Sequence, residues 1–430
     1  MALTANEALN NKKFEIQIIT MLKRLFKSTF LFAFIGVLSC GNQNKKAQSS
    51  EEIAMNDQEE TAVKEIILAA NRTQAYLPLL KNKKVGIVGN QTSIMKNEAG
   101  GFTHIVDSLL ALDVNLIKGF APEHGFRGTA DAGEAVEDDK DAQTGLPVIS
   151  LYGNNKKPKA AQLEDLDVLI FDLQDVGTRF YTYISSLHYV MEACAENDVQ
   201  LIVFDRPNPN GHYIDGPILE TEFKSFVGMH PIPTVHGLTM GEYAKMINGE
   251  KWLKDGIQCD LKVIEMENYN HSKAYDLPVK PSPNLPNAQA INFYPSLCFF
   301  EGTNVNAGRG TNKQFQVFGS PFLDKDLFDF TYTPEPKPGA KHPKHLGKVC
   351  YGRDLSEIPR VNKINLKWLI EAYQHTENKN EFFNAFFTKL AGTKELQSQI
   401  VKGLSAEEIR KNWKPGLAKF SEKREKYLLY

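Results

Sequence analysis

Short apolar runs alternate with longer amphipathic stretches between residues 85 and 204. The runs cover residues 85–88, 114–120, 148–151, 168–171 and 201–204, which are lengths typical of buried strands. Between them, residues 103–112 and 181–197 carry apolar side chains at intervals of three and four, the period of an α-helix. Strands that alternate with helices predict parallel β-α-β units, and therefore an α/β fold with a doubly wound, mostly parallel sheet.

The pattern changes after residues 215–217, where proline and glycine become frequent. Residues 239–248 predict a helix that begins at Thr239, because Glu242 three residues later completes a capping box. We expect a first domain over residues 71–250 and a smaller α+β domain over residues 251–430. The second domain should contain a strand at residues 261–265, helices at 365–374, 381–390, 396–402 and 405–413, and a last helix with Pro415 at its first position.

Basic residues precede an apolar run at residues 30–38 that closes on Ser39, Cys40 and Gly41. This run is shorter than the roughly 20 residues that span a bilayer as a helix, so a cleaved secretion signal is the better interpretation. Residues 37–40 resemble a bacterial lipobox, in which the cysteine becomes the lipidated first residue. We therefore predict a signal and N-terminal extension over residues 1–39 and a flexible tether over residues 40–70. The predicted location is periplasmic or membrane-anchored through lipid on Cys40, and the alternatives are a plain signal peptide and a retained membrane anchor.

Composition and charge narrow the classes of partner. The chain has 430 residues, of which 42% are hydrophobic and 24% charged, as in ordinary globular proteins. Its net charge of -2 offers no basic field to polyanions, which argues against nucleic acid as a partner. The cysteines after Cys40 form no C-x-x-C pair, so a structural zinc site is not supported. In an exported protein they could form disulfides or be buried as thiols, and the sequence leaves the pairing open for Cys194, Cys259, Cys298 and Cys350.

Polar residues follow four of the five predicted strands. They occupy residues 89–93, 122–128, 172–179 and 205–211, and they include glutamate, histidine, aspartates and arginines. The carboxyl ends of parallel strands meet at one edge of a sheet, where ligands bind in open α/β folds. The sequence therefore predicts a cleft for a polar ligand at this edge.

The absence of several motifs restricts the chemistry. The sequence has no G-x-S-x-G, P-loop or H-E-x-x-H motif, and residues 308–313 lack the third glycine of G-x-G-x-x-G. We therefore expect no nicotinamide or other cofactor, and the expected mechanism needs no metal. Acid–base chemistry by carboxylates remains, as in glycoside hydrolysis. Glu123 is the candidate acid, with His124 beside it, and Asp172 and Asp175 are candidates for the second carboxylate.

These polar loops also resemble motifs of the exo-β-N-acetylmuramidase family of the NamZ type, which acts in peptidoglycan recycling. The matching segments are Asn-Gln-Thr-Ser at 90–93, Pro-Glu-His-Gly-Phe-Arg-Gly at 122–128, Asp-Arg-Pro-Asn-Pro at 205–209, His-Gly-Leu-Thr at 236–239, Pro-Ser-Pro-Asn-Leu at 281–285, and residues 172–183, 300–311 and 427–430. The resemblance implies a Rossmann-like N-terminal domain, a smaller C-terminal domain, and a cleft that releases N-acetylmuramic acid from non-reducing ends of peptidoglycan fragments.

Such a substrate implies roles for several arginines and asparagines. Its lactyl carboxylate favours a guanidinium partner, for which the candidates are Arg127, Arg179, Arg206 and Arg309. Its acetamido and hydroxyl groups favour amides, for which the candidates are Asn90, Asn208, Asn284 and Asn304. Glu301 is a further candidate carboxylate, or else the ion-pair partner of Arg309. The competing hypotheses are a lipoprotein that binds muropeptides without catalysis and a peptidoglycan hydrolase of another class, such as an amidase.

Overall fold

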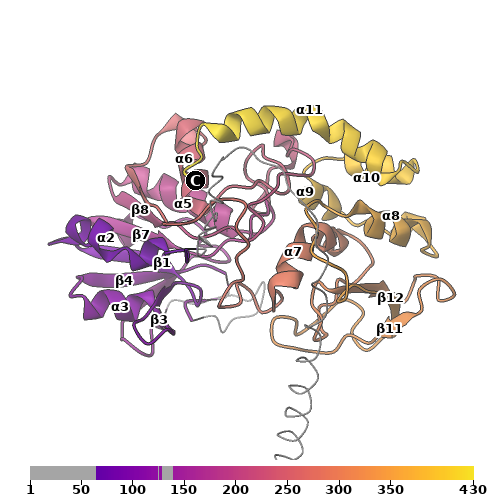
Figure 1. Cartoon of the computed structure of the whole chain (residues 1–430), viewed down its shortest axis with the longest axis horizontal. Helices are drawn as coiled ribbons and strands as arrows, with labels where there is room; N and C mark the ends of the chain where they lie inside the picture. The colour runs from indigo at the N-terminus through magenta and orange to yellow at the C-terminus, as the bar shows by residue number, and fades with distance from the viewer. Residues whose placement is uncertain (1–63, 124, 128–138) are drawn as a thin grey trace, which may run out of the picture. The chain divides into compact units, whose positions relative to one another are not determined.

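A computed structural model describes residues 64–123, 125–127 and 139–430 of the chain. Its largest element is a seven-stranded sheet with the order β5-β6-β4-β1-β7-β8-β9. Figure 1 labels four of these strands, β4, β1, β7 and β8. Neighbouring strands are parallel except for the edge pair of β5 and β6. The strands are β1 (Val85–Gly89), β4 (Leu116–Ala121), β5 (Asp139–Lys140), β6 (Pro147–Ser150), β7 (Val168–Asp172), β8 (Gln200–Phe204) and β9 (Leu261–Ile264).

Helices cover both faces of this sheet. Side chains that alternate along β1 point to opposite faces: Val85 and Ile87 pack in one core with Tyr76 of α2 (Thr73–Leu80), and Val88 packs in the other. The first core also takes residues from α3 (Ile105–Ala111), and the second takes residues from α5 (Tyr183–Glu196) and α6 (Met240–Gly249). The predicted doubly wound α/β fold is confirmed.

The C-terminal part of the chain adds a smaller α+β region. Its three strands are antiparallel in the order β10-β12-β11, namely β10 (Val317–Ser320), β12 (Cys350–Asp354) and β11 (Phe330–Tyr332). The helices are α7 (Ala288–Leu297), α8 (Leu366–Gln374), α9 (Phe387–Ala391), α10 (Glu395–Val401) and α11 (Ala406–Glu425). The remaining short elements are the β2 (Ile94–Lys96) and β3 (Phe102–His104) pair, α4 (Ala160–Leu163), and 3-10 turns at Ala69–Asn71, Thr221–Phe223, Lys254–Gly256, Cys298–Gly302 and Lys379–Glu381.

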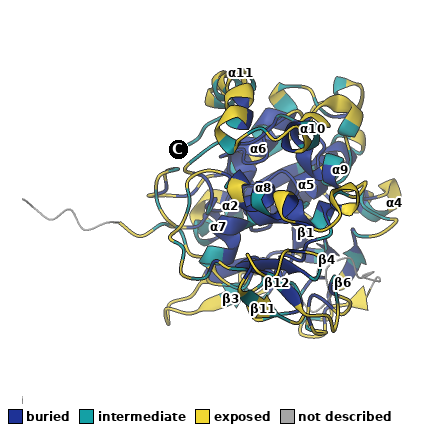
Figure 2. Ribbon diagram, turned by 90° about the vertical axis from the view of Figure 1, so that its right-hand side faces the viewer, coloured by how far each residue is buried: buried dark blue, intermediate teal, exposed yellow. Residues whose placement is uncertain are grey.

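The prediction that Pro415 begins a new helix is wrong, because α11 continues through it. A proline inside a helix removes one backbone hydrogen bond, a cost of about 3 kcal/mol. Tertiary contacts of the helix offset this loss, since Ile409, Trp413 and Phe420 are buried while the opposite face is exposed (Figure 2). Pro415 therefore sits inside a helix that packing stabilises along most of its length.

The chain end is fixed against the sheet through Asp205, which follows β8. Its carboxylate accepts hydrogen bonds from Thr239 Oγ1 at 2.7 Å, Gly241 N at 2.8 Å and Tyr430 OH at 2.9 Å. Thr239 and Glu242 form the predicted capping box at the start of α6. Burial raises the pKa of Asp205 to about 7. Asp205 thus joins the start of α6 to the C-terminus.

Several predictions concern residues at the N-terminus or the division of the chain. The signal at residues 1–39 and the lipidation of Cys40 lie outside the described residues. The compact fold begins before residue 71, because Ile67 pairs with Glu267 and Ala69 and Ala70 are buried. The domain boundary at residue 250 stays a prediction, and the large sheet takes β9 from beyond it.

In the described part of the chain, no helix combines the length and apolar character needed to cross a membrane. The four cysteines in this part are buried free thiols, namely Cys194, Cys259, Cys298 and Cys350.

Candidate active site

The carboxyl ends of the central strands meet beside a cavity of about 260 Å³. The pairing of β1 places Gly89 next to Asp172 of β7, and β4 ends on the other side of β1. Loops that leave neighbouring parallel strands at such a point form the usual ligand crevice of an open α/β sheet. The structure brings four predicted site residues into the cavity wall: Glu123, Asn284, Glu301 and Arg309.

Hydroxyl-bearing side chains make up much of the remaining wall. They are Tyr152, Tyr181, Thr182, Tyr183, Ser282 and Tyr294. A larger depression, of about 800 Å³, lies beside residues 64–68 and contains none of the predicted site residues. We take the smaller cavity as the candidate site because it combines two carboxylates, a guanidinium and aromatic rings.

Glu123, directly after β4, is held by two hydroxyl groups. Tyr152 OH donates to Glu123 Oε1 at 3.1 Å, and Thr182 Oγ1 donates to Oε2 at 3.0 Å. Burial and the Glu123 charge raise the pKa of Tyr152, so its hydroxyl stays protonated and remains a donor. The carboxyl group is therefore fixed in orientation at the cavity wall, partly buried, as an acid–base group requires.

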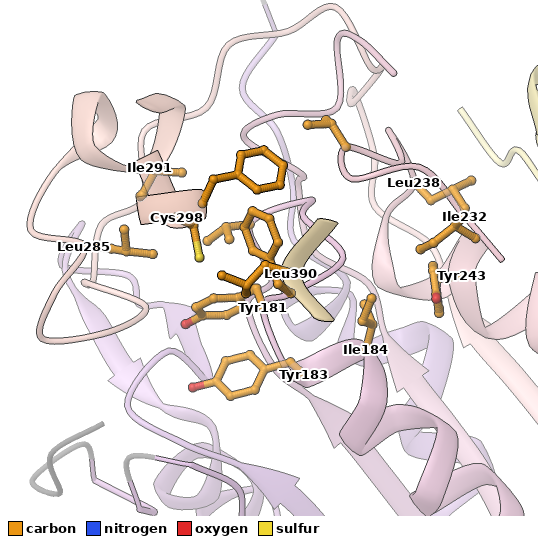
Figure 3. Close-up of a cluster of buried hydrophobic side chains, with 14 of the residues drawn as sticks. Tyr181, Tyr183, Ile184, Ile232, Leu238, Tyr243, Leu285, Ile291, Cys298 and Leu390 are labelled. Atoms are coloured by element: carbon orange, nitrogen blue, oxygen red, sulfur yellow. The ribbon is translucent and has the colours of Figure 1, made fainter. Parts of the chain in front are cut away.

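Two tyrosines at the start of α5 stand beside this carboxyl group. The rings of Tyr181 and Tyr183 are 4.8 Å apart edge to face, and Figure 3 shows their hydroxyls turned the same way, with Cys298 and Leu285 beyond Tyr181. Asn90 Nδ2 donates to Tyr183 OH at 2.6 Å. The amide of Asn90 is therefore used to orient a cavity tyrosine, whereas Asn90 itself is not in the wall.

Arg309 and Asn284 share one anchor on the opposite side of the cavity. Asn284 Nδ2 donates to Gly339 O at 2.7 Å, and Arg309 Nη2 donates to the same oxygen at 3.1 Å. Arg309 Nη1 lies 3.6 Å from Glu301 Oε2, an ion pair longer than a hydrogen bond. Arg309 Nε and Asn284 Oδ1 are buried without a hydrogen-bond partner.

Comparison with known proteins agrees with the motifs in the loops. The family described as "Exo-beta-N-acetylmuramidase NamZ, N-terminal" matches residues 85–289, and its C-terminal counterpart matches residues 292–430. The chain belongs to the NamZ family. The "Peptidoglycan beta-N-acetylmuramidase NamZ" of Bacillus subtilis is 39% identical over 377 residues, which is 82% of this chain and 90% of the relative. The predicted family is thereby confirmed.

Two solved structures share the fold over most of the chain. Both are DUF1343 family proteins from Bacteroides fragilis. The first is 45% identical with a TM-score of 0.79, and the second is 29% identical with a TM-score of 0.71. Each alignment covers 85% of this chain and 99% of the solved one. The NamZ-type architecture of this chain therefore matches solved structures over nearly their whole length.

Three of the four arginines proposed for substrate binding in this NamZ chain already have internal partners. Arg127 donates to the carboxylates of Asp107 and Asp141, and these partners raise its pKa further above its usual value. Arg206 donates to both oxygens of Asp172, at 2.5 and 2.8 Å.

Arg179 is fully buried, and both of its terminal nitrogens donate to the main chain, while its Nε has no partner. It donates to the carbonyls of Pro217, Ile232, Leu390 and Ala391 at 2.7–2.9 Å. The structure places Arg127, Arg179 and Arg206 outside the cavity wall, so of the four predicted arginines it brings Arg309 alone to the cavity.

The two aspartates proposed as second carboxylates are also outside the wall. Asp172 is fully buried in its ion pair with Arg206. Asp175 accepts from Gly177 N at 2.6 Å and lies 3.8 Å from His236 Nε2, and burial raises its pKa to about 7. The structure therefore does not bring either group to Glu123, and Glu301 is the other carboxylate in the described part of the wall.

The remaining predicted residues are accounted for as follows. Asn208 donates to Leu238 O at 2.8 Å and accepts from Asn210 N, so its amide holds a loop. Asn304 is not in the wall, although its Oδ1 is buried without a partner. His124 lies outside the described residues. No group of three or more histidine, cysteine, aspartate or glutamate residues placed to hold a metal is found within the described ranges.

Sequence reasoning missed Tyr152, which contacts Glu123. Tyr152 follows β6, which corresponds to the predicted strand at residues 148–151, so the rule that ligands bind at the carboxyl ends of parallel strands points to it as well. Tyr294 and Cys298 lie within α7 and the turn after it, where nothing in the local pattern distinguishes a cavity residue from a core residue.

Proposed function

We propose that this chain is an exo-acting β-N-acetylmuramidase, a glycoside hydrolase that releases N-acetylmuramic acid from the non-reducing ends of peptidoglycan fragments. The observation that carries the proposal is the placement of Glu123, fixed by two hydroxyls in a tyrosine-lined cavity, in a chain of the NamZ family. The cavity volume of about 260 Å³ is near the lower end of small-molecule pockets, which suits one terminal sugar better than a long glycan.

In this proposal Glu123 is the acid that protonates the glycosidic oxygen as the bond to the anomeric carbon breaks. Glycosidases complete the reaction with a second carboxylate or with the acetamido group of the substrate. Among the described residues, Glu301 is the other carboxylate in the wall and the candidate for that role, because Asp172 and Asp175 lie outside the wall. Water then adds to the anomeric carbon, and the product is the free sugar.

The role of Glu123 is tested with two substrates that differ in their leaving groups. Glu123→Gln should lower kcat on a muramyl-glucosamine disaccharide by about 10²-fold or more, because a sugar alkoxide needs a proton to leave. The same variant should lose much less on the para-nitrophenyl muraminide, because nitrophenolate leaves without one. Glu407→Gln, on an exposed turn of α11, is the matched control and should keep both rates.

Equal losses on both substrates would assign Glu123 a structural role instead of proton donation. A wild-type protein that binds the disaccharide and leaves it intact would contradict the hydrolase proposal, and a released peptide would indicate an amidase.

We also propose that the protein is exported and tethered to a membrane by lipid on Cys40. The support is the sequence alone: the basic flank, the apolar run and the lipobox-like residues 37–40. The wild-type protein should partition into the detergent phase of a cell extract, and Cys40→Ala should move it into the aqueous phase. A wild-type protein that stays in the aqueous phase would contradict the anchor.

A further inference from the structure

We propose that Arg309, with Asn284 beside it, binds the carboxylate of the lactyl group and so selects muramyl over glucosaminyl sugars. This inference rests on the proposed function, because the lactyl carboxylate is what distinguishes the two sugars. Arg309 is the one cationic side chain in the described part of the cavity wall. A guanidinium is the preferred partner of a carboxylate, since its planar set of N–H donors can make two parallel hydrogen bonds.

Arg309 has a donor left for a ligand. Its Nη2 is held by Gly339 O, but its Nε is buried without a partner. Its Nη1 is 3.6 Å from Glu301 Oε2, which is electrostatic contact without a hydrogen bond. Nη1 makes an ion pair and no hydrogen bond, so it is the donor that a ligand carboxylate can take. Arg127, Arg179 and Arg206 offer no comparable donors at this cavity.

Asn284 provides the complementary acceptor. It is 4% exposed, it lines the cavity, and its Oδ1 has no hydrogen-bond partner while its Nδ2 is occupied by Gly339 O. Because the Nδ2 contact fixes the amide, Oδ1 must face away from Gly339 and can accept only from something else. Because Oδ1 is shielded from solvent, the side chain has to shift before a sugar hydroxyl or the acetamido N–H can donate to it.

Gly339 sets the positions of both side chains. Its φ of +83° belongs to the left-handed region that favours glycine. A Cβ at this position would lie 2.5 Å from Pro283 Cβ and 3.0 Å from Asn284 Nδ2. The carbonyl that anchors Arg309 and Asn284 is thus presented by a backbone conformation that a side chain would disturb.

The charged groups nearest Arg309 are Glu301 and Lys344. Lys344 adds a second cation close to Glu301 and Arg309, but its Nζ is used on the carbonyls of Phe300, Thr303 and Val305. Lys344 therefore contributes charge, whereas Arg309 contributes the hydrogen bonds.

A cycle of two enzymes and two substrates tests the contact. The substrates are para-nitrophenyl N-acetyl-β-muraminide with a free lactyl carboxylate and the same compound as its methyl ester, which keeps the bulk and removes the charge. Esterification should lower kcat/KM of the wild type about 10- to 100-fold, the range for loss of a charge-assisted hydrogen bond. The same esterification should change kcat/KM of Arg309→Gln less than about threefold.

Arg309→Lys keeps the charge without the planar fork and should show an intermediate cost of esterification, which keeps the test valid if Arg309→Gln does not fold. Arg360→Gln, an exposed arginine paired with Asp276, is the control and should behave as the wild type. An equal cost of esterification in the wild type and both Arg309 variants would overturn the inference and leave the proposed function standing. A wild type that cleaves neither substrate would instead contradict the proposed function.

Discussion

Replacement of Arg179 by methionine tests whether this arginine holds the fold together or binds substrate. Its guanidinium joins the carbonyls of Pro217 and Ile232 to those of Leu390 and Ala391, which end α9. Methionine is apolar and of similar length, so it would fill much of the space and remove all the donors. A cation at the C-terminal end of a helix also interacts favourably with the helix dipole, and the substitution would remove that interaction.

The magnitude follows from the carbonyls that lose their partner. Ile232 O also accepts from Leu219 N at 3.1 Å, so three of the four carbonyls depend on Arg179. A buried group without its hydrogen bond costs about 1–3 kcal/mol. Burial of the guanidinium is itself unfavourable, which is why its pKa falls to about 9, and this offsets part of the loss. We expect Arg179→Met to lower the free energy of unfolding by about 3–5 kcal/mol.

Urea unfolding followed by far-ultraviolet circular dichroism measures this change, and kcat/KM in the absence of urea measures catalysis. Arg360→Met, at an exposed ion pair, should change stability by less than about 1 kcal/mol. The reasoning would be refuted by an Arg179→Met protein within about 1 kcal/mol of the wild type whose kcat/KM has fallen more than tenfold.

Three further predictions concern other positions. Asp172→Asn should lower the free energy of unfolding by about 3–5 kcal/mol in the same urea assay, because it leaves the buried guanidinium of Arg206 without its carboxylate; a change below about 1 kcal/mol would contradict this. The pKa of Asp175 rises from 3.8 to about 7 on folding, so the folded state binds more protons and stability should fall as pH rises from about 4 to about 7. Asp175→Asn should flatten the dependence of stability on pH over that range, and an unchanged slope would contradict its assignment to Asp175. Gly339→Ala should lower the free energy of unfolding by about 1–3 kcal/mol, and it should lower kcat/KM for the free-acid muraminide more than for its ester. An equal loss of kcat/KM on both substrates would show that Gly339 has no part in recognition of the carboxylate.

Local periodicity was sufficient to predict most of the large sheet and its helices. The apolar runs at 85–88, 168–171 and 201–204 correspond to β1, β7 and β8, and the capping box at Thr239 marks the observed start of α6. These features depend on neighbours along the chain, so they can be read without a fold. The position of Pro415 inside a helix could not be predicted from local pattern, because the contacts that keep α11 continuous come from elsewhere in the structure.

The candidate site was only partly predictable. The rule that ligands bind at the carboxyl ends of parallel strands led to Glu123, and the family motifs led to Asn284, Glu301 and Arg309. Tyr294 lies within a helix and could not be recognised, because position in a helix does not say whether a side chain borders a cavity.

The sequence by itself determined the family, the alternation of strands and helices, and the edge of the sheet where polar residues gather. The tertiary structure decided which of those polar residues remain available to a ligand. Arg179 and Arg309 look alike in the sequence, but Arg179 donates to Leu390 O, 211 residues further along the chain, whereas Arg309 lines the cavity with an Nη1 that makes an ion pair and no hydrogen bond. Hydrogen bonds between residues so distant in sequence form only when the chain folds, and they determine which charged groups are left for chemistry.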